Sequence, residues 1–192
     1  MRIALLIMGT ARSDYARRCM ASLDDSQFCG VLHHDDVEPR QGLAASVQLC
    51  WDELRSWDLD YVFHVEEDFV FPDPPPIDDM AAILAANPEL AQVALYRQPW
   101  SPEEIAADGY LNLHSDQYEQ REGYLVTDRL FTLNPCLYPA WLMDIGWPDR
   151  GGEAEFTAIC REKGLRFGLY GQRTDSARCI HIGARRSAGW TL

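Results

Sequence analysis

The chain has 192 residues, of which 47% are hydrophobic and 24% charged, so it is long enough for one folded domain and short for two. Its formal net charge of -13 excludes a general affinity for nucleic acid or anionic membranes, because both require a basic surface. The six cysteines include no CxxC pair, which excludes the usual zinc-ribbon and thioredoxin signatures.

The first part of the chain alternates between strand-like and helix-like patterns. The expected elements are a strand at 2–8, a helix at 13–23 capped by Ser13, a strand at 28–36, a helix at 42–57 and a strand at 60–71. The first apolar run is too short for a signal-peptide core or a membrane span, so we expect a cytoplasmic protein.

The second part continues the alternation with one interruption. We expect a helix within 74–90 capped by Asp78 or Asp79, a strand at 91–100, a strand and turn at 129–142, a helix at 153–164 and a strand at 165–171. Residues 101–128 are polar with weak periodicity, which indicates a long functional loop or lid. The pattern predicts a single α/β domain over 1–192, with three layers and a mostly parallel central sheet whose carboxyl edge binds ligands.

Three consecutive acids, Glu66, Glu67 and Asp68, end the third predicted strand. In extended backbone Glu66 and Asp68 point to one face and Glu67 to the other. Buried carboxylates without partners cost several kcal/mol, so a cation is expected beside them, and oxygen ligands suit Mg²⁺ or Mn²⁺. A solvated acidic turn is the plain alternative.

A second group of candidate residues lies near the end of the chain. His181 stands between two isoleucines, and Arg185 and Arg186 follow it closely. Histidine is a common metal ligand, and paired arginines can grip a diphosphate, although a lone histidine in an apolar run is often a core residue.

Glu153 and Glu155 follow a glycine pair at the start of a predicted helix. Either could act as a general base, or both could serve the helix dipole. Aromatic residues near the proposed cleft could stack on a sugar or pack in the core; they are Trp100, Tyr110, Trp141 and Trp147.

Five short motifs occur in a characteristic order, at residues 10–23, 31–39, 64–71, 151–164 and 181–183. Together they resemble a compact GT-A type glycosyltransferase, the nucleotide-sugar-dependent class related to family 2, in the minimal form of phages and bacteria. The resemblance implies a Rossmann-like GT-A fold. The sequence departs from the family where Ala154 follows Glu153, and where the Asp-Asp turn lacks the usual Gly-Ser.

The resemblance also implies roles for individual residues around the nucleotide. Thr10 and Arg12 would line the base and ribose pocket, and Asp35 or Asp36 would contact the base. Glu66 would face the ribose, and Glu67 of the same acidic motif would also contact the nucleotide.

The remaining roles concern the metal and the chemistry. Asp68 and His181 would bind Mn²⁺ or Mg²⁺, and Arg185 or Arg186 would hold the leaving diphosphate. Glu153 or Glu155 would deprotonate the acceptor, with Glu155 preferred.

The function predicted on this basis is metal-dependent transfer of a sugar from a nucleotide-sugar donor, UDP-sugars being favoured, to a hydroxyl of a saccharide or protein acceptor. A base on the far side of the sugar from the phosphate predicts inversion of the anomeric centre. The alternatives are a sugar-phosphate nucleotidyltransferase, a metal-dependent phosphohydrolase or nuclease, and a non-catalytic carbohydrate-binding module. The first of these would need a glycine-rich phosphate loop, and residues 6–13 offer Gly9 alone.

Overall fold

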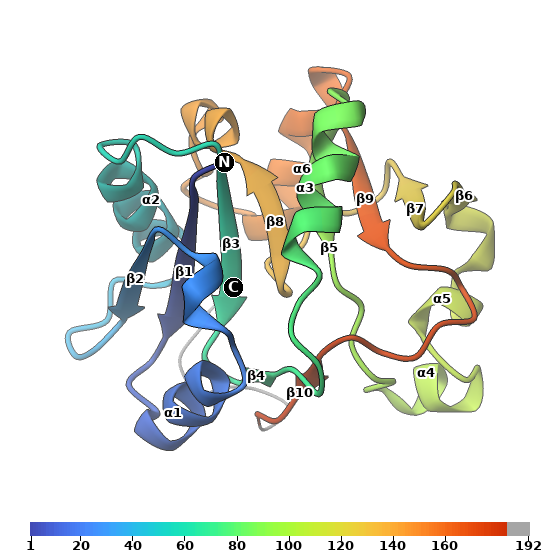
Figure 1. The fold of residues 1–192 in the computed structure, drawn as a ribbon, viewed down its shortest axis with the longest axis horizontal. Helices are drawn as coiled ribbons and strands as arrows, with labels where there is room; N and C mark the ends of the chain where they lie inside the picture. The colour runs from blue at the N-terminus through green and yellow to red at the C-terminus, as the bar shows by residue number, and fades with distance from the viewer. Residues whose placement is uncertain (184–192) are drawn as a thin grey trace.

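An eight-stranded mixed sheet runs through the computed structural model, which describes residues 1–183 (Figure 1). The spatial order of the strands is β2-β1-β3-β8-β5-β9-β7-β6. Their bounds are β1 Ile3–Gly9, β2 Gly30–Asp35, β3 Tyr61–Glu66, β5 Leu90–Ala94, β6 Glu119–Gln120, β7 Tyr124–Thr127, β8 Cys136–Pro139 and β9 Arg166–Tyr170. A second, two-stranded sheet pairs β4 (Phe69–Val70) with β10 (Ile180–His181).

Most of the large sheet is parallel, as the alternating pattern predicts. β1 pairs in parallel with β2 and β3, and β5 pairs in parallel with β9. β8 lies antiparallel between β3 and β5, a direction that the sequence pattern does not reveal. Because two antiparallel pairings restore the direction, the carboxyl ends of β1, β2, β3, β5 and β9 meet at one edge.

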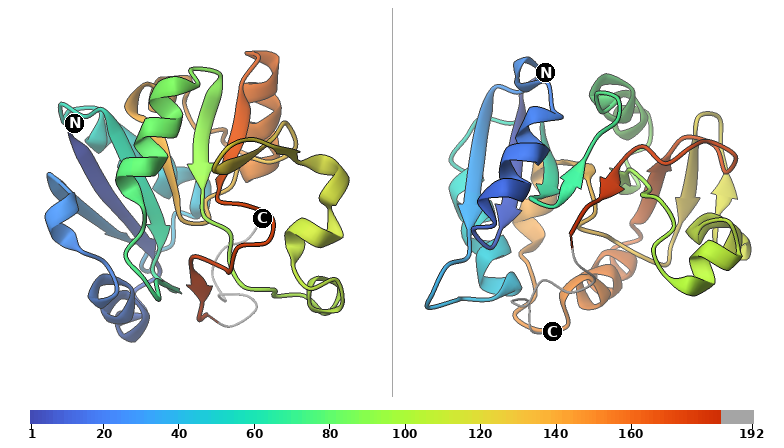
Figure 2. Two further views of the ribbon diagram at one scale, coloured as in Figure 1. Left: turned by 45° about the vertical axis from the view of Figure 1, so that its right-hand side comes forward. Right: turned by 90° about the horizontal axis from the view of Figure 1, so that it is seen from below.

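Helices cover both faces of this sheet (Figures 1 and 2). Their bounds are α1 Ser13–Ala21, α2 Leu43–Leu54, α3 Ile77–Ala86, α4 Pro102–Ala106, α5 Tyr110–Leu113 and α6 Gly152–Glu162, with short 3-10 turns at η1 Asp25–Gln27, η2 Ser115–Gln117 and η3 Ala140–Ile145. Within residues 1–183, no helix combines the length and apolar character needed to cross a bilayer.

Side chains of β1 alternate between two separate cores. Leu6 packs in the core that α2 and α6 share, whereas Leu5 packs in the core against α1 and α3. Trp51 of α2 lies at the centre of the first core, and its Nε1 donates to the hydroxyl of Tyr138 at 2.9 Å. Trp147 packs edge-on against Trp51 at 5.6 Å between ring centroids, so this candidate sugar platform belongs to the core. Burying large side chains of this kind on both faces fixes the sheet as the middle layer.

Two helix starts differ from the expected caps. Arg12, and not Ser13, occupies the N-cap of α1, and no side chain caps that helix. Pro76 occupies the N-cap of α3, so Asp78 and Asp79 lie in its first turn, where their charges favour the helix dipole.

Residues 101–128 are more regular than the sequence pattern predicts. Ser101 and Glu104 form a reciprocal capping box at the start of α4, a signal that the sequence does contain. Glu104 is 7% exposed and pairs with Arg97, whose Nη1 lies 2.8 Å from the carboxylate. α5 follows, and β6 and β7 then extend the main sheet. The segment expected as a loop is therefore a built part of the domain.

Candidate active site

The acidic motif lies where β3 ends, and the chain turns there instead of staying extended. β3 stops at Glu66, and Glu67 and Asp68 form the turn before β4. Arg12 binds both turn residues, with Nε 2.6 Å from Glu67 Oε1 and Nη2 2.9 Å from Asp68 Oδ2. The expected alternation, with Glu66 and Asp68 on one face, is therefore wrong, because it assumed a strand that continues past Glu66.

Glu67 is completely buried, and its hydrogen bonds hold the loop between β1 and α1 in place. Its carboxylate accepts from the backbone N–H of Thr10 at 2.9 Å, from the Thr10 hydroxyl at 3.2 Å and from the backbone N–H of Arg12 at 3.1 Å. A Cβ on Gly9 would lie 2.5 Å from Glu67 Oε2, so only glycine allows this close approach. The structure thus gives Glu67 a different place from the predicted nucleotide contact: it holds the loop that carries Thr10 and Arg12.

The two acids at the end of β2 have different surroundings. Asp36 is 2% exposed, and its carboxylate accepts from the backbone N–H groups of Gln41 at 2.8 Å and Gly42 at 3.0 Å. It therefore closes the turn that leads into α2. Asp35 accepts from the backbone N–H of Ala11 at 3.1 Å, which places it beside the loop that includes Thr10. Of the two alternatives, Asp35 is the one next to the expected nucleotide pocket.

Asp68 and His181 come together although they are far apart in the sequence. Asp68 Oδ2 lies 3.5 Å from His181 Nε2. The pairing of β4 with β10 sets His181 opposite Phe69, and Figure 2 shows these short strands side by side. The backbone of Gly183 packs so closely on this carboxylate that an added Cβ would lie 2.2 Å from Asp68 Oδ2. The structure therefore brings the two expected metal ligands into one place.

Residues that follow β5 hold His181 in position. The side chain of Gln98 bonds both backbone groups of His181, accepting from its N–H at 2.9 Å and donating to its carbonyl at 2.9 Å. The ring of Trp100 meets the imidazole edge-on, with 4.3 Å between centroids. Burial lowers the pKa of His181, Asp68 opposes this shift, and Arg97 adds to it. The imidazole is thus favoured in the neutral form that binds metals.

The residues present fit a divalent cation. Asp68 Oδ1 and His181 Nδ1 are both buried, and neither has a hydrogen-bond partner within residues 1–183. A carboxylate with an imidazole is a suitable donor pair for a first-row metal such as Mn²⁺. Across residues 1–183, no group of three or more His, Cys, Asp and Glu side chains is arranged to hold a metal. A cation here would therefore depend on water and ligand oxygens for its other positions, as Mg²⁺ and Mn²⁺ commonly do.

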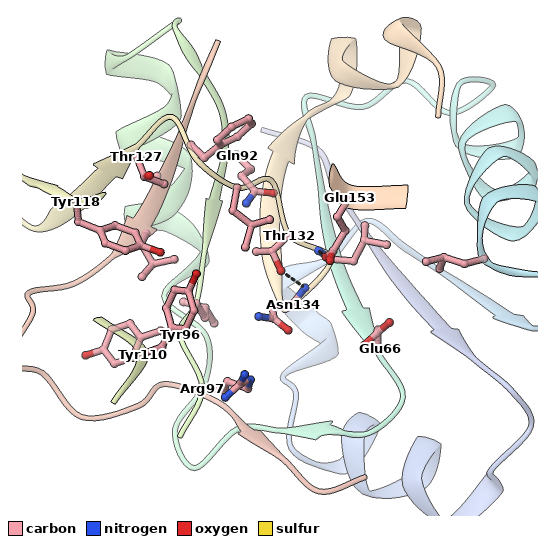
Figure 3. A pocket seen from close by; sticks show the side chains of 17 residues that line it. Glu66, Gln92, Tyr96, Arg97, Tyr110, Tyr118, Thr127, Thr132, Asn134 and Glu153 are labelled. Atoms are coloured by element: carbon pink, nitrogen blue, oxygen red, sulfur yellow. Dashed lines mark hydrogen bonds between the residues drawn. The ribbon is translucent and has the colours of Figure 1, made fainter. Parts of the chain in front are cut away.

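A cavity of about 350 Å³ opens beside this cluster at the carboxyl edge of the sheet. Figure 3 shows Glu66 and Glu153 on one side of it and Tyr96, Tyr110 and Tyr118 on the other. Its remaining lining residues are Leu43, Gln92, Leu95, Arg97, Thr127, Leu130, Thr132, Leu133, Asn134, Phe167, Gly168 and Leu169. Its size lies within the usual range for small-molecule sites.

Glu66 lies at the cavity wall in an environment that disfavours its charge. Burial raises the pKa of Glu66 to about 8, the charges of Asp68 and Glu153 add to the shift, and Arg12 opposes it. A group with a strongly perturbed pKa in a cavity is a candidate functional residue.

Glu153 and Glu155 occupy opposite positions on α6. Glu153 lines the cavity and accepts from the backbone N–H of Leu133. Burial raises the pKa of Glu153, and its hydrogen bonds with Leu133 and Thr132 oppose this rise. Glu155 is exposed, and it packs against Gly151 at the start of the helix. The structure therefore places Glu153 at the cavity, and the preferred Glu155 on the exposed side of the helix.

Other expected residues are distributed differently. Trp141 is 44% exposed and lines a separate surface hollow with Met1 and Asp60. Arg185 and Arg186 lie outside the described residues.

Sequence reasoning also missed Arg97, Tyr96 and Tyr118 as cavity residues. The position of Tyr96 and Arg97 just after β5 is the signal that could have found them, because ligands gather at carboxyl ends of parallel strands.

No protein-family model and no curated protein sequence matches the chain. Solved structures do. A mannosyltransferase from Pyrobaculum calidifontis in complex with GDP-Man and Mn²⁺ matches with a TM-score of 0.63 and 13% identity, over 96% of this chain and 58% of that one. GalNAc-T7 with UDP, GalNAc and Mn²⁺ matches with a TM-score of 0.62 and 10% identity, over 99% of this chain and 45% of that one. A197 from STIV matches with a TM-score of 0.55 and 15% identity, over 89% of this chain and 82% of that one.

The chain has the GT-A fold. This confirms the predicted fold class, with its mostly parallel central sheet between helical layers. The chain spans 58% and 45% of the lengths of the first two enzymes, so their activities and substrates do not transfer to it directly. Within the GT-A fold, the cluster of Asp68, His181 and the cavity carboxyls lies at the carboxyl edge where this architecture binds ligands.

Proposed function

We propose that this GT-A chain is a metal-dependent glycosyltransferase that moves a sugar from a nucleotide-sugar donor to an acceptor hydroxyl with inversion. The observation that carries the proposal is the meeting of Asp68 and His181, 3.5 Å apart, beside a cavity that holds two further carboxyls. The complexes of similar folds with Mn²⁺ and with GDP-Man or UDP support a divalent ion and a nucleotide-sugar donor. UDP-sugars are the first donors to test.

The loop that Glu67 holds would form the nucleotide pocket. Thr10 and Arg12 lie on this loop, and Asp35 contacts it from the end of β2. Asp68 and His181 would hold Mn²⁺ or Mg²⁺. When bound, such an ion stabilises the negative charge that develops on the departing diphosphate. Arg12 donates to Asp68 Oδ2 at 2.9 Å and would hold this carboxylate in place beside the ion.

Glu153 is the proposed general base. Its carboxylate takes the proton of the acceptor hydroxyl while the hydroxyl oxygen forms a bond to the anomeric carbon. The bond from that carbon to the phosphate oxygen breaks at the same time, and the diphosphate leaves with the electron pair. Burial raises the pKa of Glu153 above its ordinary value, which makes the carboxylate a better proton acceptor. Attack from the side opposite the diphosphate inverts the anomeric centre, so NMR of the product should show the configuration changed.

A thermal-shift panel tests the proposal directly. UDP-, GDP-, dTDP- and CMP-sugars are each added with and without Mn²⁺, and the melting temperature is measured. A ligand at 100 times its Kd stabilises the folded chain by about 2.7 kcal/mol, which for a chain of this size raises Tm by roughly 5–11 °C. We expect one donor class to do so in the presence of Mn²⁺ only.

Two variants test whether the Mn²⁺-dependent shift in melting temperature arises at Asp68 or at any acidic residue of the surface. Asp68→Asn should abolish the Mn²⁺-dependent shift, whereas Asp73→Asn, at an exposed acid nearby, should keep it. Stabilisation that survives in Asp68→Asn, or that needs no divalent ion, contradicts the proposed site. Release of a nucleoside diphosphate from the stabilising sugar, and not of pyrophosphate from a nucleoside triphosphate, then identifies the transferase reaction.

A further inference from the structure

The cavity has a second end that the proposed metal site and base do not explain. Three tyrosines form it: Tyr96 follows β5, Tyr110 begins α5 and Tyr118 follows η2 (Figure 3). We call these three residues the tyrosine wall. The rings of Tyr110 and Tyr118 meet edge-on with 6.4 Å between centroids, and the ring of His114 lies 4.6 Å from that of Tyr110. Rings that pack on one another hold a rigid apolar surface, which suits the flat CH face of a sugar ring.

Uncharged polar groups border the tyrosine wall. Gln92, Thr132 and Asn134 line the cavity between the wall and the carboxyls, and Thr127 lies beside Tyr118 (Figure 3). Amide and hydroxyl groups can donate to and accept from sugar hydroxyls, and a few such groups fix the orientation of a ligand in an otherwise apolar site. The combination of aromatic surface with neutral polar groups favours a carbohydrate.

The charges that line the cavity further limit the class of ligand that it can bind. Arg97 is the basic residue among the described lining residues, and its guanidinium donates to both oxygens of Glu104 at 2.8 and 3.1 Å and to the carbonyl of Gln98 at 3.0 Å. Its charge is therefore already paired. Glu66 and Glu153 add carboxyls at the other end. At the tyrosine wall the described lining residues offer an acidic ligand no unpaired cation, so this end of the cavity disfavours uronic acids.

We propose that the tyrosine wall is the acceptor subsite and that it takes a neutral saccharide, not a polypeptide or an acidic sugar. The inference rests on the proposed function, because it assigns the acceptor end of the same cavity. The volume of about 350 Å³ equals that of about a dozen water molecules, which suits roughly one or two sugar rings. An extended polypeptide would instead need an open groove along which its backbone could bind.

Saturation-transfer NMR tests this subsite without any donor or metal. The probes are methyl glucoside, methyl galactoside, methyl mannoside and methyl N-acetylglucosaminide, with methyl glucuronide and a Ser/Thr-containing peptide for comparison. We expect transfer to the ring protons of at least one neutral glycoside and none to the glucuronide or the peptide. Tyr118→Ala should weaken that glycoside's binding about tenfold, equivalent to about 1.4 kcal/mol of lost aromatic contact. Trp141→Ala, at an exposed aromatic residue of a separate hollow, should bind as the parent does.

If Tyr118→Ala does not fold, Asn134→Ala replaces it, because this residue reaches the same cavity from a different segment. Equal binding by the parent and the substituted chain, or saturation transfer to the peptide or glucuronide alone, overturns the inference.

Donor hydrolysis without acceptor distinguishes this inference from the proposed function. Mn²⁺-dependent release of a nucleoside diphosphate reports on the donor site alone. If hydrolysis occurs and the peptide, not a glycoside, accepts the sugar, the subsite assignment fails while the transferase proposal stands. If no donor is hydrolysed or transferred but glycoside binding still depends on Tyr118, the tyrosine wall stands as a saccharide-binding site, its role as an acceptor subsite fails, and the transferase proposal fails.

Discussion

Replacing Glu67 with Gln tests whether this buried acid holds the loop between β1 and α1. Glu67 Oε1 accepts from Thr10 N–H and from Arg12 Nε, and Oε2 accepts from Arg12 N–H. Glutamine has one side-chain oxygen where glutamate has two, so it can accept hydrogen bonds at only one of these two positions. In the better orientation its amide nitrogen faces the Arg12 N–H, so two donors oppose each other and the Arg12 guanidinium loses its charged partner.

The expected cost follows from these contacts. Hydrogen bonds to charged groups contribute about 1.5–3 kcal/mol each, and breaking a buried ion pair costs about 3–5 kcal/mol. The Arg12 side chain is 26% exposed, so water can compensate part of the loss. We therefore expect Glu67→Gln to destabilise the fold by about 3 kcal/mol, which lowers Tm by roughly 6–12 °C in a chain of this size.

Urea denaturation followed by circular dichroism measures the free energy of unfolding of both chains. Asp14→Asn is the matched control, because it removes an ion pair with Arg17 whose side chains are 85% and 74% exposed. Exposed pairs contribute about 0.2–1 kcal/mol, so the control should lose less than 1 kcal/mol. A loss in Glu67→Gln no larger than that of the control would refute the reasoning.

Three further predictions concern single residues near the site. His64 is fully buried, neither of its ring nitrogens has a hydrogen-bond partner in the described part of the chain, and burial lowers its pKa to about 3. Below pH 6.5 the unfolded chain binds a proton that the native chain does not, so this residue costs stability as the pH falls from 6.5 to 3. His64→Leu should therefore gain in unfolding free energy over the parent by up to about 1.4 kcal/mol for each pH unit below 6.5, measured in urea at pH 7 and pH 5. Glu153→Gln should lower the rate of sugar transfer by about 10²–10⁴-fold, while Glu155→Gln on the exposed side leaves the steady-state rate unchanged. Gln98→Ala releases both backbone bonds to His181 and should weaken Mn²⁺ binding by about 10–100-fold, measured by electron paramagnetic resonance of free Mn²⁺.

The sequence could predict the regular parts of the fold because their patterns are local. β1 is an uninterrupted apolar run, and such a run is typical of a strand with helices on both faces. The sequence also contains a signal that distinguishes the positions of Glu153 and Glu155. Residues three and four apart share a helix face, so Glu153 lies on the side of Phe156 and Thr157, which are buried. The helical period therefore predicts that Glu153, and not Glu155, faces the inside of the domain.

Other features depend on contacts between distant segments. Glu67 turns inward because β3 ends at Glu66, and the following turn is held where β4 pairs with the strand that contains His181. The alternating pattern of an extended strand does not show that β3 ends at Glu66. The direction of β8 is likewise fixed by its pairing with both β3 and β5, and its four residues carry no signal of orientation. The charge of Arg97 is paired with that of Glu104, and the sequence pattern predicts a loop at Glu104. The pattern therefore does not predict this ion pair.

The charges around the acidic turn impose an order on ligand binding. Arg12 is bound to Glu67 and Asp68, so one cation meets two carboxylates. A donor diphosphate that approached this cluster by itself would meet repulsion, because like charges at short range disfavour one another. A divalent cation at Asp68 reverses the sign of the local field. We therefore expect the metal to bind before the nucleotide sugar or together with it, so that the apparent Kd of the donor rises steeply when Mn²⁺ is removed with a chelator. If the apparent Kd of the donor does not change when the chelator is added, Arg12 alone balances the negative charge of the diphosphate.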